Sequence, residues 1–151
     1  MLVILELDSH MAPSVGQTAE RSRSVTERDI ELFSEISGDF NPIHYDAEMA
    51  AQTRFGEVVV QGGVITAILN AVVAEDLPGP GSVFLQTNYR FLAPVRPGDT
   101  ITGRVEVTKV RTDKPITELK TTVSRDDGII VLEGEAVCYT MDLKGRQHAS
   151  G

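Results

Sequence analysis

The sequence predicts an α+β fold in which one buried helix packs against an antiparallel sheet. The stretch 64–77 (VITAILNAVVAEDL) is apolar on nearly every side, as expected of a helix enclosed by other structure. After it, the chain consists of segments rich in Val, Thr and Ile that are separated by short turns, with no helical stretch between them. A parallel sheet would need helical crossovers between those strands, so we expect antiparallel pairing.

The first half of the chain is expected to contain one short strand and a first helix. Residues 14–24 are polar and can hold the strand. The helix then begins after Thr26, which can cap the backbone amide three residues on, and ends at Gly38. Its apolar residues recur at helical spacing and predict one buried face: Ile30, Phe33 and Ile36.

Two further helices are expected before the strands. Asp46 is expected to cap a short helix over 46–55 (DAEMAAQTRF), which Gly56 ends. The apolar helix follows Gly62 and stops at 77–81 (LPGPG), where the repeated Pro and Gly cannot continue a helix.

The predicted strands alternate with period two and are joined by turn-forming residues. Four segments have this character: 82–95, 99–112, 116–125 and 129–143. The turns 96–99 (RPGD) and 126–128 (DDG) are typical of hairpins, so the sequence predicts an antiparallel meander. Cys138 alternates within the last strand and is expected in the core.

The chain has 151 residues, which fits one domain over 14–143, with an N-terminal extension (1–13) and a C-terminal tail (144–151). It lacks an apolar run long enough for a membrane span, and the cytoplasm is the expected compartment. A net charge of −8 argues against nucleic-acid binding. The three scattered histidines and one cysteine predict no metal site, and we expect no cofactor.

An acidic chain must hold any phosphate-bearing ligand with a local basic patch. One cluster near a predicted strand end could do so: Lys109, Arg111 and Lys114. The simpler interpretation is a charged strand edge that resists aggregation.

The segment 37–46 (SGDFNPIHYD) carries the candidate chemistry. It places a carboxylate at Asp39, a carboxamide at Asn41 and an imidazole at His44 within six residues of a loop. Pro42 restricts the residue before it to extended or turn geometry, which excludes regular helix here. A carboxylate and an imidazole can hold one water between them and exchange the roles of acid and base when water adds to a carbon–carbon double bond.

Such a double bond must be conjugated to a carbonyl, whose oxygen then needs a hydrogen-bond donor. Gly62, at the start of the apolar helix, offers a backbone amide and the positive end of the helix dipole. Each candidate also has a plain structural interpretation. Asp39 and Asn41 can be turn residues and His44 a surface histidine. Gly62 can simply permit close helix packing.

The segment 38–44 (GDFNPIH) resembles the signature of the MaoC-like dehydratases, which include the (R)-specific enoyl-CoA hydratases. Residues 61–63 (QGG), the helix after them and the turn 96–99 match the same family in order and spacing, so the resemblance covers roughly 14–142. Two residues depart from the pattern: Gln61 stands where His is frequent, and Gly63 where a larger apolar residue is common.

The resemblance implies a hot-dog fold, with a long helix wrapped by a curved antiparallel sheet, and a homodimer whose two sheets join. It implies that Asp39 and His44 are the catalytic pair, that Asn41 positions water or substrate, and that the Gly62 amide polarises a thioester carbonyl. The expected reaction is reversible syn hydration of trans-2-enoyl-CoA to (R)-3-hydroxyacyl-CoA. No cofactor takes part, and the partner is an acyl-CoA or an acyl carrier protein thioester.

Three alternatives to this activity stay open. A 3-hydroxyacyl-acyl carrier protein dehydratase uses the same chemistry on another carrier. A hot-dog thioesterase would place a carboxylate on the central helix, but residues 64–74 contain none. A non-catalytic acyl-binding subunit would have no use for an Asp39–His44 pair.

Overall fold

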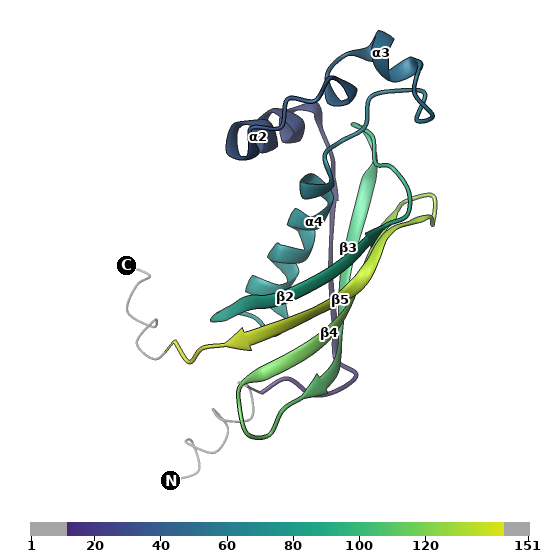
Figure 1. The fold of residues 1–151 in the computed structure, drawn as a ribbon. Coiled ribbons are helices and arrows are strands. Elements are labelled where there is room, and N and C mark those ends of the chain that lie inside the picture. Colours follow the sequence, from purple (N-terminus) through teal and green to yellow (C-terminus); the bar gives the residue numbers. More distant parts are fainter. Residues whose placement is uncertain (1–11, 144–151) are drawn as a thin grey trace.

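The computed structural model describes residues 12–143 and confirms the α+β class (Figure 1). Residues 1–11 of the predicted extension and the tail 144–151 lie outside the described residues. The elements in chain order are β1 (Thr18–Ser24), α2 (Glu27–Ser37), the 3-10 helix η1 (Pro42–His44), α3 (Ala47–Ala51), α4 (Gly62–Ala71), the π-helical turn η2 (Val72–Asp76), β2 (Ser82–Phe91), β3 (Thr100–Val110), β4 (Ile116–Arg125) and β5 (Ile130–Thr140).

The five described strands form one antiparallel sheet in the order β1-β3-β4-β5-β2. Helix α4 runs along one side of this sheet, and α2 and α3 lie together at one end of it (Figure 1). This is the arrangement of a central helix against a curved sheet that the hot-dog expectation describes.

The predicted meander is wrong for its first strand. β2 pairs with β5 at one edge, so the turn 96–99 joins β2 to a strand that is not its neighbour. The local turn does form, because the Asp99 amide donates to the Arg96 carbonyl at 3.0 Å. The residues beside it bond elsewhere: the Gly98 amide donates to the Val25 carbonyl, and the Val25 amide to the Asp99 carbonyl, both at 2.8 Å. The turn 126–128 is a true hairpin between β4 and β5.

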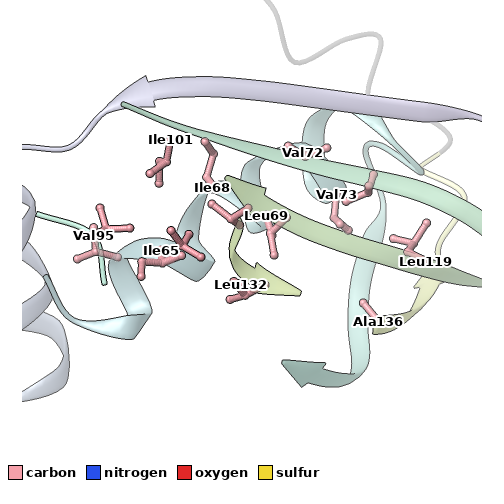
Figure 2. Packing of buried hydrophobic residues seen from close by; sticks show 14 of the residues in the cluster. Ile65, Ile68, Leu69, Val72, Val73, Val95, Ile101, Leu119, Leu132 and Ala136 are labelled. Carbon is pink, nitrogen blue, oxygen red and sulfur yellow. The ribbon is translucent and has the colours of Figure 1, made fainter. Parts of the chain in front are cut away.

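The core lies between α4 and the sheet. Side chains of α4 and η2 face those of the strands (Figure 2): Ile65, Ile68, Leu69, Val72 and Val73 on the helical side, and Ile101, Leu119, Leu132 and Ala136 on the sheet side. Each large side chain so buried stabilises the fold by about 1.5–3 kcal/mol. Gly103 of β3 allows the helix to approach closely, because a Cβ there would lie 2.6 Å from Cγ2 of Ile68.

Helix α2 begins after Thr26 and ends at Gly38, as predicted, but its buried face is different. Gly38 takes a left-handed φ of 77°, which favours glycine. Ile30 is buried, whereas Ile36 is 84% exposed, so its assignment to the buried face was wrong. At about 100° per residue, Ile36 lies far around the helix from Ile30. Ser34 lies near Ile30 on that face and is buried in its place.

The second predicted helix is shorter than expected. Asp46 caps it as predicted, with its carboxylate accepting hydrogen bonds from the amides of Glu48 and Met49. However, α3 extends only over Ala47–Ala51, and the chain then turns up to Gly56. A five-residue helix has few internal hydrogen bonds, so it depends on its cap and on packing.

Candidate active site

The loop that joins α2 to η1 brings Asp39 and His44 together. After Gly38 ends α2, the Asn41 amide donates to Oδ1 of Asp39 at 3.1 Å, and the Ile43 amide donates to Oδ1 of Asn41 at 3.3 Å. Asp39 and Asn41 therefore act as turn residues, the plain structural role considered for each. These turns place Oδ2 of Asp39 3.6 Å from Nε2 of His44.

The tautomer of His44 follows from its second contact. Its Nδ1 lies 2.7 Å from the carbonyl oxygen of Val59, which can only accept. Nδ1 therefore carries a proton, so when the ring is neutral Nε2 presents a lone pair toward Asp39. The two facing acceptors can share one molecule that has two hydrogens to donate. The His44 side chain is 7% exposed and that of Asp39 is 38% exposed, so the pair extends from the protein interior to its surface.

A cavity of about 410 Å³ opens beside His44. Its wall is mostly apolar, as expected for a small-molecule site. The lining residues that matter below are His44, Arg54, Phe55, Gly62, Phe91 and Leu92. Asp39 is not among the lining residues and reaches the cavity through its contact with His44.

Gly62 lies where the sequence placed it, as the first residue of α4 and on the cavity wall. First-turn amides of a helix have no carbonyl partner within the helix, so this amide is available to an oxygen in the cavity. A Cβ at Gly62 would lie 3.0 Å from Cε1 of Phe91. The glycine thus allows close packing as well, and its role as a hydrogen-bond donor to a substrate oxygen stays a prediction.

The two departures from the family pattern both have a structural explanation. Gln61 is 2% exposed and points toward α2, where its Nε2 donates to the Ile30 carbonyl and to Oγ of Ser34, both at 3.1 Å. At Gly63 a Cβ would lie 2.0 Å from two ring carbons of Phe33, so the Phe33 ring occupies the space that a larger residue would need.

The basic cluster considered from sequence does not line the cavity. Lys109 lies 3.9 Å from Glu118 of β4, and Arg111 pairs with Asp113 at 2.6 Å. Because β3 lies between β1 and β4, these charges form surface ion pairs and do not mark an edge of the sheet. The cation on the cavity wall is Arg54, which lies over the Phe55 ring at 5.4 Å. The sequence analysis missed Arg54, because a single exposed Arg after a short helix has no pattern to mark it.

The expected place of Cys138 in the core is confirmed. Cys138 is buried in the core, and this burial raises the pKa of its thiol to about 11. Tyr45 stacks on Phe40 and does not line the cavity. Within 12–143, no group of three His, Cys, Asp or Glu side chains could hold a metal ion. No helix in the same range is long and apolar enough to cross a membrane.

Comparison with known proteins agrees with this geometry. The MaoC like domain family matches residues 10–128. The (R)-specific enoyl-CoA hydratase of Aeromonas caviae is 38% identical over 82% of this chain and 92% of its own. The 3-hydroxybutyryl-CoA dehydratase of Methylorubrum extorquens is 37% identical over 82% of this chain and 78% of its own.

A solved (R)-hydratase from A. caviae, described as involved in PHA biosynthesis, superposes with a TM-score of 0.82 at 36% identity, over 85% of this chain and 98% of that one. The expected hot-dog fold and the expected class of hydratase or dehydratase are therefore confirmed. With the family matched over most of its length, the chain belongs to the MaoC-like domain family.

Proposed function

We propose that this enzyme hydrates trans-2-enoyl-CoA reversibly to (R)-3-hydroxyacyl-CoA, with Asp39 and His44 acting on one water. The observation that carries the proposal is the pair of acceptors, Oδ2 of Asp39 and Nε2 of His44, that face each other across 3.6 Å beside the cavity. Both acceptors can bind the two hydrogens of a single water, which leaves a lone pair of the water oxygen free to attack.

The reaction would proceed on one face of the substrate. The water oxygen bonds to C3, and one of its protons passes to the Asp39–His44 pair as the π electrons move toward the thioester oxygen. The Gly62 amide would stabilise the negative charge on that oxygen. C2 then takes a proton from the same pair. Because both groups lie on one side of the double bond, hydrogen and hydroxyl are added syn. Asn41, whose carboxamide borders this pair through the turn, would help to orient the water.

The cavity and its rim fit an acyl thioester. The apolar wall can receive the acyl chain, and Arg54 at the wall offers a cation to a phosphate of the carrier. The same phosphate chemistry occurs in CoA and in the phosphopantetheine of an acyl carrier protein, so the carrier must be decided by experiment.

We also propose that the enzyme is a homodimer joined through β2. This strand pairs with β5 on one side, and its other edge has no strand partner among residues 12–143. Exposed apolar residues gather on it and just after it: Val83, Leu85, Phe91 and Leu92. Unpaired apolar edges favour strand pairing between chains. Phe91 and Leu92 also line the cavity, so a second subunit here would complete the wall of the site.

Product analysis tests the reaction. Purified enzyme is mixed with crotonyl-CoA in D2O, and the product is identified by chiral chromatography and NMR. We expect (R)-3-hydroxybutyryl-CoA with deuterium at C2 on the same face as the hydroxyl. The (S) product, or anti addition, would refute the proposed geometry. Activity only on acyl carrier protein thioesters would identify the carrier-protein dehydratase instead, and release of free CoA would identify a thioesterase.

A further inference from the structure

A buried polar cluster lies behind the Asp39–His44 loop, and its centre is the hydroxyl of Ser34. Ser34 is in the last turn of α2 and is 1% exposed. Its Oγ donates to the Asp39 carbonyl at 2.7 Å, accepts from Nε2 of Gln61 at 3.1 Å and contacts the hydroxyl of Tyr45. Ser34 and the amide nitrogen of Gln61 are buried, so these hydrogen bonds offset the cost of removing them from water, whereas the Tyr45 side chain is partly exposed.

The direction of each hydrogen bond can be assigned. A serine hydroxyl has one proton and two lone pairs. The Asp39 carbonyl can only accept, so it takes the Ser34 proton. The Ile30 carbonyl can also only accept, which identifies the atom of Gln61 that faces it at 3.1 Å as the amide nitrogen. Gln61 therefore donates to Ser34. The single proton of the Tyr45 hydroxyl lies between the remaining lone pair of Ser34 and the Ile30 carbonyl, whose oxygen is 3.4 Å from that hydroxyl. The proton and both lone pairs of the Ser34 hydroxyl then each face a hydrogen-bonding partner.

Each partner of Ser34 is either a residue of the candidate site or the chain neighbour of one. Asp39 is bound through its own carbonyl. Tyr45 directly follows His44, and Gln61 directly precedes Gly62. The Ser34 hydroxyl thus connects the three segments that carry the proposed base, acid and oxyanion donor.

The placement of the Asp39 carboxylate depends on its backbone. Among the described residues, the hydrogen bond given to this carboxylate comes from the Asn41 amide, which belongs to the same loop. The Asp39 backbone is held on both sides by hydroxyls of α2, because its amide donates to Oγ of Ser37 at 3.0 Å and its carbonyl accepts from Ser34. The Ser37 contact is exposed, whereas the Ser34 contact is partly buried and is therefore expected to be the stronger of the two.

We propose that Ser34 is a positioning residue, whose hydroxyl holds Asp39 in register with His44 and Gly62. The inference rests on the proposed function, because it assigns the purpose of this placement to the water addition. A shift of the order of 1 Å in a reacting group can cost about a hundredfold in rate. Ser34 is not among the residues that line the cavity, so loss of its hydroxyl should affect turnover and leave substrate binding unchanged.

The first test is Ser34→Ala. We expect kcat for enoyl-CoA hydration to fall about ten- to hundredfold while KM stays within about twofold. Tyr45→Phe removes one hydroxyl donor from the cluster but keeps the ring that stacks on Phe40, and should lower kcat less. Because the Tyr45 side chain is partly exposed, this variant keeps the test available if Ser34→Ala does not fold.

A control separates positioning from stability. Val107→Ala creates a small hole in the core, on a residue that lines no part of the cavity. It should lower Tm at least as much as Ser34→Ala and leave kcat unchanged. The proposal would be overturned if Ser34→Ala left kcat unchanged. It would also be overturned if Ser34→Ala lowered kcat no more than Val107→Ala does at an equal Tm.

A double-mutant cycle tests whether Ser34 acts through Asp39. If it does, Ser34→Ala should lower kcat in the wild type but cause no further loss in Asp39→Asn, since there is no longer a carboxylate to position. Independent losses in the two backgrounds would overturn the inference. If Asp39→Asn is inactive and Ser34→Ala is fully active, the positioning role of Ser34 is refuted and the proposed function stands. A fully active Asp39→Asn would overturn the proposed function together with it.

Discussion

The contact between Gly63 of α4 and Phe33 of α2 can be tested with a methyl group. In Gly63→Ala, the new Cβ would lie 2.0 Å from Cε2 and Cζ of Phe33. A normal contact between two carbon atoms is about 3.5–4.0 Å, so the ring or the helix must move by more than about 1 Å. Overpacking of this kind costs about 1–3 kcal/mol. Alanine in a helix gains up to about 1 kcal/mol over glycine. The net expectation is a loss of up to about 2 kcal/mol.

The sign of this change is what tests the structure. For a domain of this size, the loss corresponds to a decrease in Tm of up to about 8 °C, which differential scanning calorimetry can measure. Without the ring contact, Gly63→Ala would stabilise the protein through helix propensity alone. The matched experiment is Gly63→Ala in a Phe33→Leu background, where we expect the destabilisation to disappear. An increase in Tm in the wild-type background would refute the packing of α2 against α4 described above.

Two further predictions concern Arg54 and Cys138. Arg54→Ala should raise KM for CoA thioesters about two- to fivefold, more at low salt, while kcat and the control Lys109→Ala stay near wild type. An unchanged KM would exclude Arg54 as a phosphate contact. Burial raises the pKa of Cys138 to about 11, so at pH 8 the folded protein should not react with a thiol reagent until denaturant is added. Rapid modification of native protein would contradict the core packing of β5.

Much of the fold could be predicted from local patterns. The apolar stretch after Gly62 forms the central helix, and strands form in the segments that have the period-two pattern. Strand order was less accessible, because a turn sequence reports local geometry and not the partner of each strand. The 96–99 turn is of hairpin type, yet β2 pairs with the distant β5. The residues of that turn bond instead to Val25, which lies far away in the sequence.

The candidate site shows the same limit. The spacing in 37–46 predicts that Asp39 and His44 meet, and they lie 3.6 Å apart; their catalytic roles stay predictions. The spacing could not reveal the buried hydroxyl of Ser34, because nothing in a helix sequence marks which polar residue will face a loop. The helical periodicity also assigned Ile36 to the buried face of α2, although this side chain is exposed. The sequence alone does not explain why Gln61 departs from the family pattern. The structure does, because the Gln61 side-chain amide donates a hydrogen bond to Ser34.

The central claim is that the Asp39 carboxylate acts with His44 on the attacking water. The most direct test compares crotonyl-CoA hydration by wild type, Asp39→Asn and the matched control Asp46→Asn, followed by the loss of enoyl thioester absorbance. Asn caps a helix as well as Asp does, so Asp46→Asn should keep both α3 and full activity. We expect Asp39→Asn to lose at least about a hundredfold in kcat. Near-wild-type turnover in Asp39→Asn would contradict the account.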